Sequence, residues 1–200
     1  MATAGIRAHI EGLSPTTIFT TRDVLKYGKR GAVDQYLYIL VKRGTIRRLA
    51  RGVFVQDKNI NPSIEEIAQI KAAAFARRIC KNATEVLCKL ALFRQTNLTD
   101  KSSGKTFAIN GRSSSFQSYR GAVIYKGIAQ RRLKLCDSKT GEKVYALWHL
   151  RDDDHIERAV NFVFRQMNSA ERLDLRACSS LMPGWLNDMF VERFVRTLAA

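Results

Sequence analysis

An amphipathic stretch that runs directly into a basic hairpin does most to limit what this chain can fold into. Within residues 30–43, apolar side chains recur at the i, i+3, i+4, i+7 and i+8 positions: Val33, Tyr36, Leu37, Leu40 and Val41. This spacing predicts a helix with a single buried stripe, and Gly44 is expected to end it. A two-stranded hairpin is predicted next, with its strands at residues 45–50 and 53–55 and its turn at Arg51 and Gly52.

The residues before this helix complete a small predicted domain. Residues 6–13 have the apolar spacing of a short helix, and residues 18–20 are expected to be extended. Thr20 or Thr21 then caps a second helix that Gly28 ends. Two short helices, a longer helix and a basic hairpin in this order are typical of a winged helix–turn–helix. We expect this domain to occupy residues 1–58.

Residues 59–63 form the predicted boundary, and residues 59–200 are expected to form a second domain. Ser63 begins a helix that is expected to run to about Cys80. Strands are predicted at residues 106–109, 123–125, 132–135 and 143–148, with a turn at 137–141, and helices are predicted at 156–167 and after Pro183 and Gly184. We therefore expect an α+β protein, with an N-terminal winged helix–turn–helix followed by a mixed α/β C-terminal domain with terminal helices.

The charge of the chain narrows the possible partners. The sequence has 34 Lys and Arg against 18 Asp and Glu, a net charge of +16, and a pI near 10.1. Such an excess is typical of a nucleic-acid-binding protein, although a highly soluble protein without a polyanionic partner is the alternative. Residues 151–200 are close to neutral, so we expect the binding surface before them. No apolar stretch is long enough to cross a membrane and no signal peptide is evident, so we expect a cytoplasmic protein with reduced cysteines.

Two groups of polar residues in the N-terminal segment are candidates for contact with DNA. The first group lies on the predicted helix of residues 30–43, opposite its apolar stripe, or just before it: Lys29, Arg30, Asp34, Gln35, Tyr38 and Lys42. The second group lies in the hairpin: Arg47, Arg48 and Arg51. Arg and Gln can bind guanine and adenine with two hydrogen bonds, and clustered arginines suit phosphates or a narrow minor groove. The alternatives are a solvated helix face and an edge strand protected by charge.

A further basic group lies in the predicted strands of the second segment. It comprises Arg112, Arg120, Lys126, Arg131, Arg132 and Lys134. These residues alternate with Phe116, Tyr119 and Tyr125, and basic and aromatic residues together can form a nucleic-acid platform. The same aromatic residues are equally compatible with the core of a half-buried sheet.

No pattern in the sequence supports an enzyme, a metal site or a cofactor. Residues 103–106 resemble half of a phosphate-binding loop, but Thr99 occupies the position where the full motif needs glycine. The three aspartates at 152–154 precede a predicted helix, where they are expected to cap it. The three histidines lack the spacing of metal ligands. We therefore expect neither a catalytic residue nor a small-molecule substrate.

The N-terminal segment resembles the winged helix of AbiEi-like antitoxins, the regulators of type IV toxin–antitoxin systems. The resemblance rests on Phe19 and Thr20, on residues 32–35 and 40–44, and on the hairpin at 46–52. Further along, residues 111–113 and Ala146 with Leu147 are similar to the family's C-terminal domain, whereas the polar stretch at 95–105 departs from it. The resemblance covers most of the chain and is closest in the N-terminal segment.

The resemblance implies a repressor that binds inverted repeats upstream of its own operon. Its functional partner would be a nucleotidyltransferase toxin encoded next to it, which need not form a stable complex with it. The positions that would face DNA are Lys29, Arg30, Gln35, Tyr38, Arg47, Arg48 and Arg51.

Two other classes of function stay open. One is an RNA-binding module. The other is a DNA-binding regulator or a protein adaptor of a plasmid or conjugative element without a toxin. In the adaptor, the final helix would dock a partner through exposed Trp185, Phe190 and Phe194.

Overall fold

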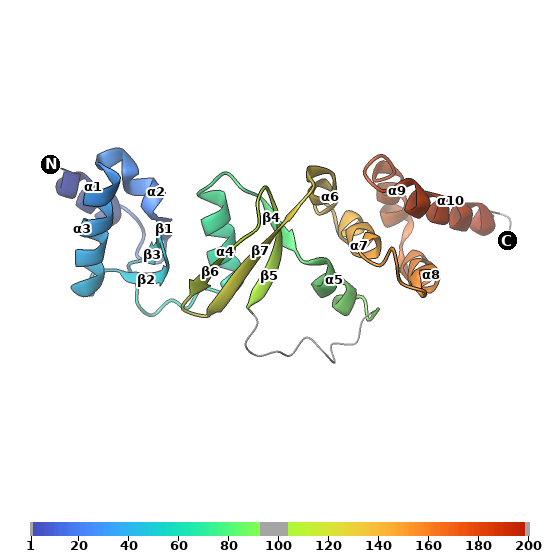
Figure 1. Ribbon diagram of the computed structural model, residues 1–200, viewed down its shortest axis with the longest axis horizontal. Helices are drawn as coiled ribbons and strands as arrows, with labels where there is room; N and C mark the ends of the chain where they lie inside the picture. The colour runs from blue at the N-terminus through green and yellow to red at the C-terminus, as the bar shows by residue number, and fades with distance from the viewer. Residues whose placement is uncertain (1, 93–103, 199–200) are drawn as a thin grey trace. The chain divides into compact units, whose positions relative to one another are not determined.

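A computed structural model describes residues 2–92 and 104–198 and shows a mixed α+β protein (Figure 1). The chain divides into two compact units. The N-terminal unit comprises Met1–Arg78 and Ser114–Tyr125, and the C-terminal unit comprises Ile79–Ser113 and Lys126–Ala200. These units differ in extent from the predicted domains 1–58 and 59–200, because a helix and a later hairpin pack with the N-terminal segment.

The N-terminal unit contains four α-helices, a 3₁₀ turn and five antiparallel strands within its described residues. Its helices are α1 (Ala2–Glu11), α2 (Thr21–Val24), α3 (Arg30–Lys42) and α4 (Ile64–Ala73), with the 3₁₀ turn η1 (Leu25–Tyr27) after α2. Its strands are β1 (Ile18–Thr20), β2 (Arg47–Ala50), β3 (Val53–Val55), β6 (Ser114–Ser118) and the first part of β7 (Gly121–Ile128). They lie in the order β1-β3-β2-β6-β7, with Ala50 of β2 opposite Ser118 of β6.

Local signals place the elements of residues 1–55 and the start of α4 where the sequence predicts them. Thr20 and Asp23 form a capping box at the start of α2, and Ser63 and Glu66 form another at the start of α4. Gly44 follows α3 with a φ of 70°, a conformation that favours glycine. The core of this unit is built from apolar residues of the helices and the hairpin: Ile6, Ile10, Val33, Leu37, Leu40, Ile46 and Phe54. The predicted elements of residues 1–55 are therefore present.

The C-terminal unit is mainly helical. It contains the antiparallel pair β4 (Ile79–Lys81) and β5 (Lys105–Asn110). Its helices are α5 (Ala83–Lys89), α6 (Gln130–Leu135), α7 (Lys139–Trp148), α8 (Ile156–Gln166), α9 (Ser169–Ala177) and α10 (Gly184–Leu198). One apolar core joins α5, α7, α8 and α10 and includes Leu87, Leu147, Phe164 and Phe190.

Two predicted strands in this unit are helices. Residues 132–135 belong to α6 and residues 143–148 belong to α7. The predicted turn at 137–141 is instead the start of α7, because the Ser138 hydroxyl accepts a hydrogen bond from the Gly141 N–H at 3.0 Å. Gly141 is required there, since a Cβ at this position would lie 1.9 Å from the Leu135 carbonyl oxygen.

The helix predicted from Ser63 to about Cys80 is shorter than expected. It ends at Ala73, and Ala76 adopts a left-handed conformation with a φ of 53°. This turn allows the chain to continue into β4, which includes Cys80. The hairpin strand β6 has no counterpart among the predicted elements, because its sequence is mostly serine and glutamine.

Of the aspartates at 152–154, Asp153 accepts two hydrogen bonds at the start of α8, and its main-chain oxygen accepts from the Ile156 N–H at 3.0 Å. The Asp153 carboxylate accepts from the His155 N–H at 2.8 Å, and His155 is the N-cap residue. Residues 95–103 lie outside the described residues. They include most of the polar stretch at 95–105 and the first residue of the motif that resembles half of a phosphate-binding loop. Within residues 2–92 and 104–198, every helix is too short or too polar to span a membrane.

Candidate nucleic-acid interface

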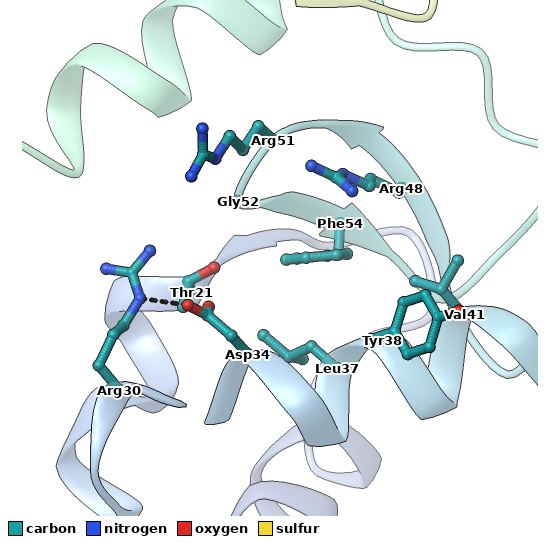
Figure 2. A pocket seen from close by; sticks show the side chains of 10 residues that line it. All are labelled: Thr21, Arg30, Asp34, Leu37, Tyr38, Val41, Arg48, Arg51, Gly52 and Phe54. Carbon is teal, nitrogen blue, oxygen red and sulfur yellow. Dashed lines mark hydrogen bonds and ion pairs between the residues drawn. The ribbon is translucent and has the colours of Figure 1, made fainter. Parts of the chain in front are cut away.

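The exposed side of α3 and the β2–β3 hairpin enclose a cleft of about 250 Å³ in the N-terminal unit. We call it the α3–hairpin cleft (Figure 2). Its lining residues are Thr21, Arg30, Asp34, Leu37, Tyr38, Val41, Arg48, Arg51, Gly52 and Phe54. Five residues that the sequence predicts as DNA contacts therefore meet here: Arg30, Asp34, Tyr38, Arg48 and Arg51.

The packing of α3 sets the direction of its polar residues. Val33, Leu37 and Leu40 are buried, so Arg30 and Asp34 lie on the exposed side. Figure 2 shows these two residues rising from α3 on one side of the cleft, with Arg48 and Arg51 on the hairpin opposite.

The hairpin is held in place at its turn. The Thr21 N–H donates to the Gly52 carbonyl oxygen at 3.0 Å, which ties the start of α2 to the turn between β2 and β3. Gly52 has a φ of 79°, and a Cβ on it would lie 3.3 Å from the Thr21 hydroxyl oxygen. Glycine therefore suits both the turn and the close approach of α2. The arginines on the hairpin are consequently attached to a fixed support.

The cleft carries a positive charge. Asp34 is its one acidic lining residue, and its carboxylate accepts from Arg30 Nε at 2.8 Å. Both side chains are half exposed or more, so this ion pair contributes at most about 1 kcal/mol and opens easily. Arg48 and Arg51 are exposed, and neither forms an ion pair among the described residues. Two guanidinium groups are therefore available to an anion.

Three predicted residues on or next to α3 do not line the cleft: Lys29, Gln35 and Lys42. Lys29 and Gln35 are exposed, and Lys29 directly precedes the helix. The Lys42 ammonium lies 5.3 Å from the centre of the Tyr38 ring, and 53% of Tyr38 is exposed. An exposed tyrosine and lysine one turn apart extend the polar surface of α3 beyond the cleft.

Arg47 differs from the other hairpin arginines because it is directed inward. Its guanidinium donates to the Ile60 carbonyl oxygen and lies 5.0 Å from the centre of the Tyr119 ring. Its Nε is buried without a hydrogen-bond partner among the described residues. These contacts attach the segment after the hairpin to β2, and they leave Arg47 less accessible to DNA than Arg48 or Arg51.

The second basic group is divided between the two units, with Arg120 in the N-terminal unit and its other five members in the C-terminal unit. In the N-terminal unit, Arg120 donates to the Asn61 and Pro62 carbonyl oxygens at 2.9 and 2.7 Å. Tyr119 donates to Pro62 as well, at 2.8 Å. Tyr125 is buried and donates to the Ala68 carbonyl oxygen at 2.7 Å, and burial raises the pKa of its hydroxyl. Tyr125 is thus a core residue.

In the C-terminal unit, the basic residues expected on a strand lie on α6. Arg131 donates to the Leu181 and Met182 carbonyl oxygens, and the Arg132 guanidinium lies 4.4 Å from the centre of the Trp148 ring. Lys134, Lys126 and Arg112 are exposed. Contact of this group with nucleic acid stays a prediction, with Lys126 on β7 and three of the other members on α6.

A second cleft contains two basic residues that the sequence did not single out. It measures about 150 Å³ and is lined by Thr20, Thr21, Arg22, Arg30, Arg51, Gly52, Lys71, Ala74 and Phe75. We call it the α2–α4 cleft. It shares Thr21, Arg30, Arg51 and Gly52 with the α3–hairpin cleft. Arg22 and Lys71 lie in helices α2 and α4, and no motif distinguishes either from an ordinary charged helix residue.

The final helix does not expose the aromatic face that would indicate an adaptor. Phe190 is 2% exposed, and Trp185 and Phe194 pack against the core of the C-terminal unit.

The four cysteines are free thiols, and the Cys80 and Cys136 sulfur atoms lie 2.7 Å apart. In the described part of the chain, no group of three or more His, Cys, Asp or Glu side chains is arranged to hold a metal ion.

Comparisons with protein-family models, with curated proteins and with solved structures each give no match for this chain.

Proposed function

We propose that this chain is a sequence-specific DNA-binding protein whose N-terminal segment acts as a winged helix–turn–helix. One observation carries the proposal. Arg30 of α3 and Arg48 and Arg51 of the hairpin line the same cleft, although Arg30 lies 18 or more positions before the other two in the sequence. A helix flanked by a basic hairpin is the arrangement with which winged helices bind the major groove and the adjacent backbone.

The two elements would divide the work of recognition. The major groove admits one α-helix, and α3 would present Gln35 and Arg30 to base edges there, where each can make paired hydrogen bonds. Arg48 and Arg51 would bind phosphates, which position a protein without specifying a sequence. Binding of DNA would compete with the Arg30–Asp34 ion pair, which is exposed and weak.

We further propose that the chain represses transcription as the autoregulating antitoxin of a type IV toxin–antitoxin system. The resemblance to AbiEi-like antitoxins in residues 19–52 supports this role. Occupancy of an inverted repeat upstream of its own operon would block transcription. The C-terminal unit would counter a nucleotidyltransferase toxin without a stable complex. Such a protein would act in the cytoplasm.

The test is fluorescence anisotropy of the purified chain with three probes at several salt concentrations. The probes are the DNA upstream of its own reading frame, a scrambled duplex and a tRNA. A preference of about a thousandfold or more for the upstream DNA supports a specific regulator. Equal binding of all three probes that decreases steeply with salt contradicts it, because such binding needs charge alone.

The antitoxin role needs a separate experiment. The chain is expressed with and without the neighbouring reading frame, and growth and a promoter fusion to its own operon are measured. We expect repression of the promoter by the chain and relief of growth arrest when a neighbouring nucleotidyltransferase is expressed. Repression without any toxic neighbour would instead favour a regulator of a mobile element.

A further inference from the structure

We propose that the α2–α4 cleft is a binding site for a backbone phosphate of DNA, with Lys71 of α4 at its centre and Arg22 and Arg51 beside it. The inference rests on the proposed function and extends the proposed DNA-binding surface from α3 and the hairpin to basic residues of α2 and α4. It assigns α4 to the DNA-binding surface of the N-terminal unit.

The first support is an excess of positive charge, since Arg30 is paired with Asp34 but the other three cations of the cleft have no acidic lining residue beside them. Four of the nine lining residues are Arg or Lys, and none of the nine is Asp or Glu. Cations that share a small cleft repel one another, so the arrangement costs free energy unless an anion enters it. A phosphate oxygen satisfies several such donors at once.

The state of Lys71 points to the same conclusion. Its ammonium donates to the Arg51 carbonyl oxygen at 2.7 Å and lies 4.1 Å from the centre of the Phe116 ring. Burial and the nearby charges of Arg48 and Arg51 lower the pKa of Lys71. These contacts leave the ammonium next to two arginines with donor capacity remaining, since a lysine ammonium has three N–H groups.

The surroundings hold the other cations in position. The Arg22 guanidinium lies 4.2 Å from the centre of the Phe75 ring, and 52% of this phenylalanine is exposed. A large apolar side chain with half of its surface exposed is thereby explained as a support for Arg22. Arg51 is attached to the hairpin turn that the Thr21–Gly52 hydrogen bond fixes.

The position of the site favours a DNA backbone over a separate small ligand. Arg30 and Arg51 line both clefts, so the positive surface continues from the α3–hairpin cleft into the α2–α4 cleft. A strand whose phosphate lies at Arg48 can continue past Arg51 and place a neighbouring phosphate at Lys71.

The experiment compares the wild-type chain with Lys71→Met, Lys71→Arg and the control Lys139→Met. Lys139 is exposed on α7 of the C-terminal unit, so its substitution removes the same charge from the other unit. Anisotropy with the upstream duplex is measured between 50 and 200 mM salt. One lost phosphate contact reduces the salt slope by about 0.9, so the wild type should lose about 3.5-fold more affinity over this range than Lys71→Met. Lys71→Arg and Lys139→Met should keep the wild-type slope.

Controls separate the possible failures. Thermal unfolding of each variant shows whether it is folded. A folded Lys71→Met with the wild-type slope overturns the site while the proposed function stands. No preference of the wild type for upstream over scrambled DNA overturns the proposed function instead. Pyrophosphate at constant ionic strength is the remaining probe. If it stabilises the wild type but not Lys71→Met, and the DNA slopes are equal, the ligand is a free phosphate compound and the inference is wrong.

Discussion

Several arginines of the two units differ in what their guanidinium groups contact. In the C-terminal unit, Arg131 donates to two main-chain carbonyl oxygens and Arg132 lies against Trp148. In the N-terminal unit, Arg48 and Arg51 project into a cleft and form no ion pair among the described residues. A chain with a net charge of +16 therefore does not offer all of that charge to a partner.

The difference shows what an arginine needs in order to bind DNA. A guanidinium that satisfies carbonyl oxygens contributes to the fold, and moving it to a phosphate would leave those carbonyls without partners. A solvent-exposed guanidinium on the fixed hairpin can bind a phosphate without breaking hydrogen bonds to the main chain. Arg47 and Arg120 show that this distinction holds within the N-terminal unit as well.

The largest expected effect tests whether the units are energetically separate. Phe190→Ala removes a ring from the core of the C-terminal unit and should destabilise that unit by about 3–5 kcal/mol. Both tryptophans, Trp148 and Trp185, lie in this unit, so their fluorescence follows its unfolding. We expect the tryptophan fluorescence transition at a lower temperature than in the wild type, and an unchanged DNA affinity. Loss of DNA binding at temperatures where only the C-terminal unit has unfolded would show that the units depend on each other.

A smaller effect should come from base recognition on α3. Gln35→Ala removes an exposed amide from the helix proposed to enter the major groove. Discrimination between the upstream and scrambled duplexes should fall by about 1–3 kcal/mol, with an unchanged salt slope. Competition anisotropy with duplexes mutated at single positions measures this. Unchanged discrimination would remove Gln35 from the set of base contacts.

The hairpin arginines should affect salt dependence instead. Arg48→Ala with Arg51→Ala removes two phosphate contacts, so the slope should fall by about 1.8 and the wild type should lose about twelvefold more affinity between 50 and 200 mM salt. The matched control is Arg158→Ala with Arg165→Ala, two exposed arginines of α8. A changed base preference in the hairpin variant would show that Arg48 or Arg51 contacts bases.

Arg131→Met should give the opposite pattern. The variant keeps an apolar chain but loses the hydrogen bonds to residues 181 and 182, and the C-terminal unit should lose about 1 kcal/mol in stability. Its DNA affinity and salt slope should match the wild type. Urea unfolding followed by tryptophan fluorescence and anisotropy measure the two effects. A reduced slope with normal stability would place Arg131 on the DNA interface.

The smallest effect should appear at alkaline pH. Burial raises the pKa of Tyr145 in the C-terminal unit to about 12 from an ordinary value of 10.0. The unfolded chain then ionises first, so this unit should lose stability progressively as the pH rises from about 10 to 12. In the N-terminal unit, the lowered pKa of Lys71 acts in the opposite direction, because the folded state releases its proton first. A urea midpoint from tryptophan fluorescence that stays constant above pH 10 would contradict the effect on the C-terminal unit.

The sequence by itself determined the elements of residues 1–55 and the helices near 156–166 and 184–198. Each of these has one buried stripe or a recognisable cap, such as the Thr20 box and Gly44, and such signals are local. It also placed Arg30, Arg48 and Arg51 in the candidate site, because a helix followed by a basic hairpin brings their positions together.

Only the tertiary structure decided that residues 143–148 are a helix. Val144, Tyr145, Ala146 and Leu147 are all buried, so the segment has no polar alternation and periodicity cannot separate a buried helix from a buried strand. The tertiary structure alone also brought Arg22 and Lys71 into the cleft with Arg51. It likewise decided that Arg47 and Arg131 donate hydrogen bonds to main-chain carbonyl oxygens. The physical reason is that the hydrogen-bond partner of a side chain depends on which distant part of the backbone packs against it. The local sequence around the side chain does not specify that contact.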